Sequence, residues 1–338
     1  MSHGITRRTA FALGAAAGVS ALIPGGRGGL RPARAEAATD TLTLYGAPIG
    51  VSLPLAHLVD GNALRPAVGN TGLTIWRSPD EMRAGVAAGR IEITTSPAPA
   101  AANLYNRGTG MRLAAVLTTG MLYLMTTDEA ITRIEDLAGK KVLVPFRGDM
   151  PDRVFQLLLE SAGMTVRDVA IDYVATPREA AQLLVAGQAP AAILQEPAAT
   201  MAMMRGLSQS VRVRRAINLQ TAFGEATGRG ADIPMAVLIV RDSIRERVPG
   251  LLARLVGALK RSTRWVNNNP ASAAQLGEDY MGLRAPVLER SIPHMNLSVR
   301  TPAEARSHLE FFYGMLGRQS ARLLGGRLPD SGFYLDVG

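Results

Sequence analysis

The sequence predicts an α/β protein of two similar lobes, each with parallel strands covered by helices, joined by two crossing strands. The main observation is a pattern that the chain contains twice, 98 positions apart. Ser-Pro-Asp-Glu at 78–81 opens a helical segment that ends at Gly89, and Thr-Pro-Arg-Glu at 176–179 opens one that ends at Gly187. Each copy continues into an apolar strand segment and a Pro-Ala-Ala sequence. The offset is too long for a solenoid repeat, so we expect two lobes that face each other across a cleft.

The N-terminal part of the first lobe is expected to contain three strands and three helices. The segment 42–45 alternates in polarity and is followed by glycine and proline, which is typical of a strand that ends in a turn. Ser78 is expected to cap the repeated helix, because Pro79 stands at the first helical position and Glu81 completes a capping box. The expected strands are 42–45, 73–76 and 91–95, and the expected helices are 54–60, 78–89 and 98–106.

The second lobe is expected to begin after the apolar stretch 111–127, which crosses from one lobe to the other, and to end with a return crossing at 233–240. A glycine-rich loop over the cleft is expected at 223–232. The remaining expected elements are strands 142–145, 171–174 and 191–194 and helices 151–161, 176–187, 197–204, 243–264 (broken at Pro249), 270–280 and 301–316. We therefore assign 40–122 and 241–338 to the first lobe and 123–240 to the second.

The N-terminus is typical of an export signal. Thr6-Arg-Arg-Thr9 precedes an apolar run of 13 residues at 11–23, and Ala33-Arg-Ala35 provides a cleavage-site pattern. The arginine pair favours the twin-arginine route, and the run is shorter than the roughly 20 residues of a membrane-spanning helix. The alternative is a basic tail with a hydrophobic patch. We assign residues 1–35 to the signal and expect a periplasmic protein.

Charge and cysteine content exclude several classes of protein. The chain has 37 Lys and Arg against 28 Asp and Glu, a net charge of +9. Five arginines and no acid lie in residues 1–35, so the remaining 32 basic residues leave a net charge of only +4. This weakens any nucleic-acid interpretation. The chain has no cysteine, which excludes thiol catalysis, iron–sulfur clusters and cysteine-based zinc sites.

Several segments together resemble the solute-binding proteins of bacterial ABC transporters. They are Asp-Leu-Ala-Gly-Lys-Lys-Val at 136–142, the Pro-Phe-Arg-Gly loop at 145–148, the segment at 186–197 that ends in Glu-Pro, and the export signal. The closest group is similar to nitrate, sulfonate and taurine binding proteins and to binders of the thiamine pyrimidine precursor. The resemblance covers roughly residues 42–265. It implies the type II periplasmic-binding fold, two Rossmann-like α/β lobes that close on a ligand held at their strand ends.

The loop formed by Phe146, Arg147, Gly148 and Asp149 is the main charge-selective candidate for ligand binding. It precedes a helix that begins near Pro151, and a helix N-terminus favours an anion. The Arg147 guanidinium could clamp a carboxylate, sulfonate or phosphonate. Alternatively, Arg147 could pair with a neighbouring aspartate, and Asp149 could cap the helix. A cationic ligand would make the acids the contacts.

Four further residues are candidate ligand contacts in the other cleft loops. Glu196 follows the strand 191–194, where it could accept a hydrogen bond from a ligand N–H or cap the helix 197–204. Ser96 occupies the strand end of the first lobe and could likewise contact the ligand or cap a helix. Gly50 and Ser52 lie in the first loop, where a flexible backbone can approach a ligand closely.

Catalytic, metal and cofactor sites are not expected. The four histidines show neither the i, i+4 spacing of a metal site nor the arrangement of a catalytic triad with Asp or Glu. Met201, Met203 and Met204 could suggest a copper(I) site, but methionine usually fills a core. No phosphate-binding loop, dinucleotide fingerprint or nucleophile elbow is present in the sequence.

The resemblance implies a periplasmic receptor of an ABC importer that captures a small anionic or zwitterionic ligand by lobe closure, without covalent chemistry. The ligand class is a sulfonate, carboxylate or oxyanion, the partners are a permease and an ATPase of the inner membrane, and the receptor is a monomer. The alternatives are a binder of a pyrimidine-type or amine-type ligand, a sensor input domain, or an enzyme of the same fold. The similar pyrimidine-precursor synthases rely on a cysteine-rich motif that this chain lacks.

Overall fold

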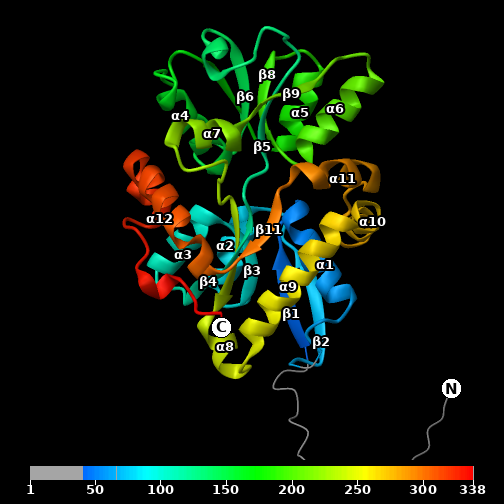
Figure 1. Ribbon diagram of the computed structural model, residues 1–338, viewed down its shortest axis with the longest axis vertical. Helices are drawn as coiled ribbons and strands as arrows, with labels where there is room; N and C mark the ends of the chain where they lie inside the picture. The colour runs from blue at the N-terminus through cyan, green and yellow to red at the C-terminus, as the bar shows by residue number, and fades with distance from the viewer. Residues whose placement is uncertain (1–40, 66, 338) are drawn as a thin grey trace, which may run out of the picture. The chain divides into compact units, whose positions relative to one another are not determined.

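The computed structural model describes residues 41–65 and 67–337, which form two β-sheets with covering helices (Figure 1). The expected export signal lies outside the described residues. The six-stranded sheet has the order β11-β4-β10-β3-β1-β2, and the five-stranded sheet has the order β7-β6-β8-β5-β9. The strands are β1 Thr41–Gly46, β2 Asn70–Ile75, β3 Ile93–Pro97, β4 Met111–Thr118, β5 Leu122–Thr126, β6 Lys141–Pro145, β7 Ala170–Val174, β8 Ala191–Gln195, β9 Arg214–Asn218, β10 Ala236–Arg241 and β11 Leu297–Arg300.

The two sheets repeat one strand arrangement. In each sheet three parallel strands are followed by an antiparallel strand, which is β10 in the six-stranded sheet and β5 in the five-stranded sheet. Strands β4 and β9 then pair antiparallel with β10 and β5. The predicted parallel strands are present in both sheets, and the antiparallel members are the strands at and beyond the crossings. The reason is that β5 and β10 each enter a sheet from the other one, so they run back along it.

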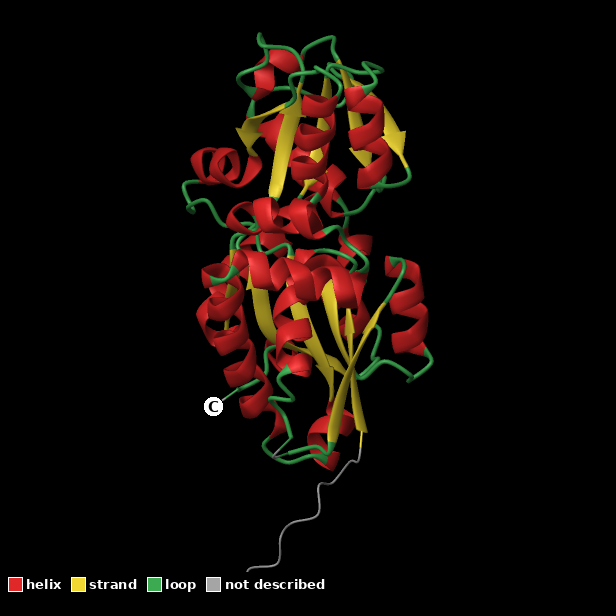
Figure 2. Ribbon diagram, turned by 90° about the vertical axis from the view of Figure 1, so that its right-hand side faces the viewer, coloured by secondary structure: helices red, strands yellow, loops and turns green. Residues whose placement is uncertain are grey.

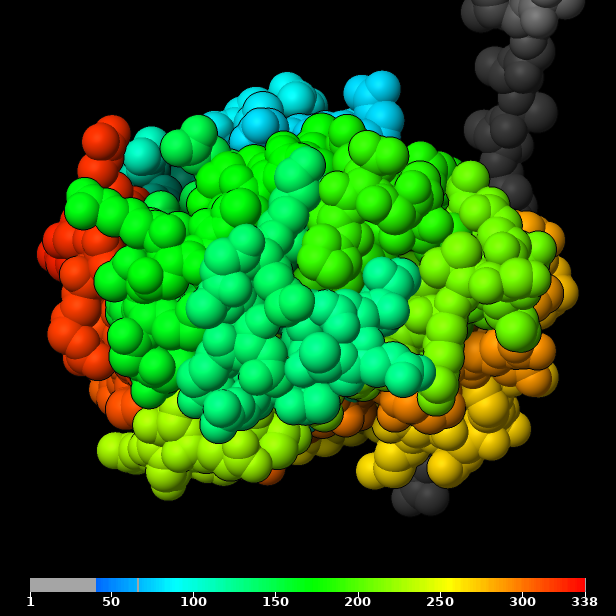
Figure 3. All heavy atoms as spheres, turned by 90° about the horizontal axis from the view of Figure 1, so that it is seen from above, coloured from blue at the N-terminus to red at the C-terminus, as the bar shows by residue number. Residues whose placement is uncertain are grey.

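Helices cover the sheets (Figure 2), and in Figure 3 the segments of the five-stranded sheet, in green, form most of the face seen from above. Helices α4 to α7 belong to the five-stranded sheet, whereas α11 contacts both α10 and α6. The helices are α1 Leu53–Asp60, α2 Pro79–Ala87, α3 Ala98–Asn106, α4 Met150–Ser161, α5 Pro177–Val185, α6 Ala198–Ser208, α7 Leu219–Thr227, α8 Asp242–Arg247, α9 Leu251–Asn268, α10 Pro270–Met281, α11 Ala285–Ser291 and α12 Pro302–Gln319. None of the described helices is long and apolar enough to cross a membrane.

The repeated sequence pattern forms the same helix–strand–helix unit in each sheet, as predicted. The Ser78 hydroxyl accepts a hydrogen bond from the Glu81 N–H at 3.2 Å, and the Thr176 hydroxyl accepts one from the Glu179 N–H at 3.1 Å. These caps start α2 and α5, and the next strands are β3 in one sheet and β8 in the other. A glycine in the left-handed region follows each helix, Gly89 at φ 75° and Gly187 at φ 72°.

The two crossings between the sheets lie at 119–121, between β4 and β5, and at 228–235, between α7 and β10. The return strand β10 pairs with β3 from Ala236 to Val240, so it belongs to the six-stranded sheet although we assigned residues up to 240 to the second lobe. The division of the chain between lobes stays a prediction. The expected cleft loop at 223–232 was partly wrong, because Asn218 caps α7 and the helix continues to Thr227.

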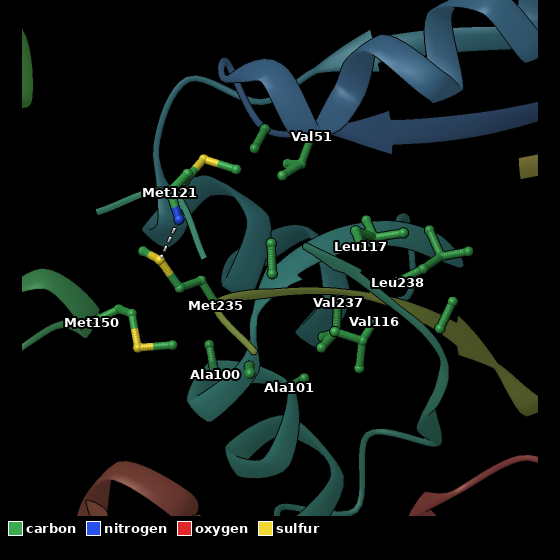
Figure 4. Packing of buried hydrophobic residues seen from close by; sticks show 14 of the residues in the cluster. Val51, Ala100, Ala101, Val116, Leu117, Met121, Met150, Met235, Val237 and Leu238 are labelled. Carbon is green, nitrogen blue, oxygen red and sulfur yellow. Dashed lines mark hydrogen bonds between the residues drawn. The ribbon is translucent and has the colours of Figure 1, made fainter. Parts of the chain in front are cut away.

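The antiparallel strands β4 and β10 of the six-stranded sheet are part of a large buried core. Val116 and Val237 face each other in the pairing of β4 with β10, and both are fully buried (Figure 4). Ala100 and Ala101 of α3 lie close to them, because their small side chains allow the helix to approach the sheet. Short β-branched and alanine side chains therefore hold the crossing strand firmly in this sheet.

Candidate ligand-binding cleft

A cavity of about 1090 Å³ lies between the two sheets. Its walls come from the loops that follow β1, β2 and β3 in one sheet and β6, β7 and β8 in the other, together with parts of α6 and α11. All six are parallel strands whose carboxyl ends meet at this cleft, which is the edge at which open α/β sheets bind ligands. The position of the cavity agrees with the cleft that the repeated pattern predicts.

The cavity lining is rich in positive charge. Arg77, Arg178, Arg205 and Arg284 line it, against Asp149 as the single acidic residue among the described lining residues. Arg77 pairs with Glu81 at 3.1 Å. No ion pair to the other three guanidinium groups is found in the described part of the chain, and all three are exposed. The rim of the cleft therefore carries an excess of positive charge.

The inner surface of the cavity is apolar and carries several methionines. Met121 and Met235 come from the two crossings between the sheets, and the Met121 N–H donates a hydrogen bond to the Met235 Sδ at 3.4 Å (Figure 4). Met150 begins α4, and Met201 and Met204 belong to α6. Thioether side chains adapt to irregular shapes, so this surface suits an apolar ligand body of variable shape.

Three of the residues predicted from the sequence line the cavity. Ser96 is buried, and its hydroxyl donates to the Pro97 carbonyl at 3.0 Å. Phe146 adopts a φ of 59°, which is rare for a bulky residue and fixes the turn after β6. Asp149 caps α4, because its Oδ1 accepts from the Met150 N–H at 2.8 Å. The ligand contacts of all three stay predictions.

Gly50 and Ser52 are not among the lining residues. A Cβ at Gly50 would lie 2.0 Å from the Met295 Sδ, so the absence of a side chain serves packing here. The Ser52 side chain is fully buried, and its hydroxyl donates to the Ala47 carbonyl at 2.7 Å. Both residues hold the loop after β1, of which Ala47 itself lines the cavity.

Arg147 and Gly148 also lie outside the cavity lining. The exposed Arg147 guanidinium lies over the ring of Tyr173, 4.9 Å from its centroid. The Gly148 N–H donates to the Asp152 Oδ2 at 2.7 Å. Two backbone donors near this helix start, the N–H groups of Gly148 and Met150, therefore already have internal acceptors. The contacts of Arg147 and Gly148 with a ligand stay predictions.

The Glu196 carboxylate has internal hydrogen-bond partners, and its contact with a ligand stays a prediction. Its side chain is fully buried, and its Oε1 lies 2.5 Å from an Arg215 Nη2 and 2.9 Å from the Nε. Its Oε2 accepts from the Thr200 N–H in the first turn of α6 at 3.1 Å. Burial raises the pKa of Glu196, and Arg215 only partly offsets this. The capping alternative is the one that the structure contains.

Sequence reasoning missed most of the cavity residues, and four of them show why. Trp76 directly follows β2, so the strand-end rule that selected Ser96 could also have selected it. Arg178 lies within the repeated motif and was read only as part of a helix start. Arg205 and Arg284 had no local signal, because they reach the cleft only through the packing of α6 against α11.

The fold and the position of the cleft define a type II periplasmic-binding fold. The family described as NMT1/THI5 like matches residues 77–273, more than half of the chain, and the chain belongs to this family. No curated protein sequence matches the chain.

Solved structures show the same fold at low sequence identity. An ABC transporter protein from Parabacteroides distasonis is 20% identical with a TM-score of 0.74, over 88% of this chain and 99% of that one. The alkanesulfonate-binding protein SsuA from Xanthomonas axonopodis pv. citri, bound to MOPS, is 16% identical with a TM-score of 0.65, over 87% and 97%. The periplasmic nitrate-binding protein NrtA from Synechocystis PCC 6803 is 14% identical with a TM-score of 0.61, over 83% and 82%. These three are described as transport or binding proteins and not as enzymes.

Proposed function

We propose that this protein is a periplasmic solute receptor that delivers a small anionic or zwitterionic ligand to an ABC importer. The observation that carries the proposal is the cavity between the two sheets, with four arginines and one acidic residue among its described lining residues. Similar structures include sulfonate-binding and nitrate-binding proteins, which supports a sulfonate, carboxylate or oxyanion ligand. We propose a monomer whose partners are the permease and ATPase of the importer.

The mechanism that we propose is closure of the two lobes around the ligand. An ion pair between the two lobes supports this mechanism. The Arg83 Nη2 of α2 lies 3.4 Å from the Oδ2 of Asp149, the residue that caps α4, and these helices cover different sheets. Both side chains are partly exposed, so this pair contributes little to stability. It is therefore able to form and break as the lobes move. No covalent step is needed.

Anions should stabilise the purified protein in a thermal-shift screen, and amines of matched size should not. We suggest screening sulfonates, carboxylates, oxyanions, amines and pyrimidines. A ligand at a hundredfold excess over its Kd adds about 2.7 kcal/mol to the free energy of unfolding. Charge attraction at an exposed rim is screened by salt, so the affinity should fall as ionic strength rises.

Variants of the arginines, tested in the same thermal-shift screen, show which of these side chains attract the anion. The double variant Arg178→Ala with Arg205→Ala should weaken anion binding by about two- to fivefold for each exposed charge. Arg147→Ala serves as the matched control outside the cavity lining and should bind like the wild type. If Arg147→Ala weakens binding and the double variant does not, the anion binds at the loop before α4 instead. Selective stabilisation by amines or pyrimidines would favour the alternative ligand class.

We propose that the protein reaches the periplasm by the twin-arginine export route. The support is the Arg7-Arg8 pair before the apolar run, in residues that the structure does not describe. Replacing both arginines by lysine should keep the charge and block export, which fractionation of cells that express the full chain would detect. Unchanged periplasmic accumulation of the lysine variant would contradict the twin-arginine route.

A further inference from the structure

Trp76 has a buried side-chain donor without an acceptor at the edge of the cleft. It directly follows β2, and its backbone N–H donates to the Gly46 carbonyl at 3.0 Å, which fixes its position. The residue is 6% exposed and lines the cavity. Its indole Nε1 is buried and has no hydrogen-bond partner in the described structure. Among the described cavity-lining residues, no other has a buried polar side-chain atom that lacks a hydrogen-bond partner.

Neighbouring polar groups in the cleft wall already have partners. The Thr95 hydroxyl accepts from the Ala47 N–H at 2.8 Å, and the Ser96 hydroxyl donates to the Pro97 carbonyl at 3.0 Å. Buried donors in native proteins are nearly always satisfied, and an unsatisfied one suggests a missing ligand or water. The indole N–H can only donate, so whatever satisfies it must present an acceptor.

We propose that the Trp76 Nε1–H donates a hydrogen bond to an oxygen of the ligand held in the cleft. The inference rests on the proposed receptor function and specifies the ligand group that reaches this wall. That group is an oxyanion or carbonyl oxygen and not an ammonium group, since an ammonium cannot accept. Trp76 and the rim arginines therefore select for the same kind of atom from two different parts of the cleft.

The chain offers a direct spectroscopic test, because it contains only two tryptophans. The other, Trp265, belongs to α9, is not a cavity-lining residue and stacks on His57 with ring centroids 4.0 Å apart. In a Trp265→Phe variant labelled with ¹⁵N-tryptophan, the single indole N–H resonance reports Trp76. The probes are benzoate and butane-1-sulfonate, with benzylammonium and butylammonium as cations of similar size.

Benzoate or butane-1-sulfonate should move the Trp76 indole proton downfield, as a new hydrogen bond does, and the ammonium probes should not. Trp76→Phe keeps an aromatic ring but loses the donor. It should therefore weaken binding of the active anion by about ten- to hundredfold, the range for a hydrogen bond to a charged group. Calorimetry measures the change, and Trp265→Phe should bind like the wild type.

The possible failures are distinguishable. One result overturns the Trp76 inference and leaves the receptor function standing. In that result an anion binds the wild type and Trp76→Phe with equal affinity, and the indole resonance of Trp76 does not move. If only the ammonium probes bind, the anionic ligand class and the inference fall together. If none of the four probes binds, the acceptor role is rejected for these oxygen groups. Should Trp76→Phe not fold, the indole resonance of Trp265→Phe alone decides between these results.

Discussion

Replacing Arg215 by methionine should destabilise the protein by about 3–5 kcal/mol at neutral pH, because the Glu196 carboxylate would then be buried without a counter-charge. The Glu196 side chain is fully buried, and 17% of the Arg215 side chain is exposed. Arg215 also donates to the Thr200 hydroxyl at 2.6 Å and lies over the Tyr123 ring. Chemical denaturation of the variant and the wild type measures the difference.

The loss should depend on pH in a defined direction. Burial raises the pKa of Glu196 in the folded state. A carboxyl group with a raised folded pKa favours folding below its unfolded pKa, about 4.3, and this contribution is lost as the pH rises through the folded pKa. Without Arg215 the folded pKa should rise further. The stability gap between the variant and the wild type should therefore widen from pH 4.5 to pH 7.5.

Two further variants control this experiment. Glu196→Gln combined with Arg215→Met removes both charges, so it should recover most of the stability that the single Arg215→Met variant loses. Arg212→Met breaks the exposed ion pair with Glu129, whose side chains are 80% and 74% exposed, and should cost at most about 1 kcal/mol. The unpaired-charge explanation is wrong if the double variant is as unstable as Arg215→Met, or if the Arg212 variant loses as much.

The parts of the fold that the sequence predicts well are those held by local interactions. Ser78 and Thr176 cap their helices through hydrogen bonds to residues three positions further along, so the signal lies within four residues. The glycines that follow these helices need a left-handed backbone at one position. Because both signals recur at one offset, the repeat predicts two equivalent units and the cleft between them.

The parts that the sequence does not predict depend on residues that meet only in the folded chain. Arg215 reaches Glu196 from the edge strand β9, and no motif links the two positions. Arg147 satisfies the local rule for an anion site, but the ring of Tyr173 on the neighbouring strand β7 holds its guanidinium instead. The direction of β10 follows from the crossing between sheets, which a single strand segment does not reveal.

The crossings deserve a test of their own, because they are the segments through which one sheet can move relative to the other. Gly120 lies in the first crossing, with a φ of 123°. Its N–H donates to the Thr118 hydroxyl at 3.0 Å, and its carbonyl accepts from the Asn296 Nδ2 at 2.6 Å. Its backbone is thus held at both ends in a conformation that only glycine adopts readily.

Gly120→Ala should destabilise the protein by about 2–5 kcal/mol, as the sum of backbone strain and overpacking. A Cβ at this position would lie 2.1 Å from the Gln220 Cγ. Gln220 is buried, and its Oε1 accepts from the Leu122 N–H, at the start of β5, at 2.8 Å. The added methyl group should therefore displace Gln220 and break its bond to the crossing strand. Thermal and chemical unfolding measure the loss.

Gly72→Ala is the matched control, because this glycine lies in β2 without a positive φ, and nothing lies within 4 Å of the added Cβ. Its stability should stay within about 0.5 kcal/mol of the wild type. Gln220→Ala in the Gly120→Ala background separates the two causes. If the collision dominates, the double variant should be more stable than the sum of the two single losses predicts. If strict additivity is found, the backbone conformation alone carries the cost. Equal stability of Gly120→Ala and Gly72→Ala would show that the first crossing tolerates a side chain, contrary to the geometry at Gly120.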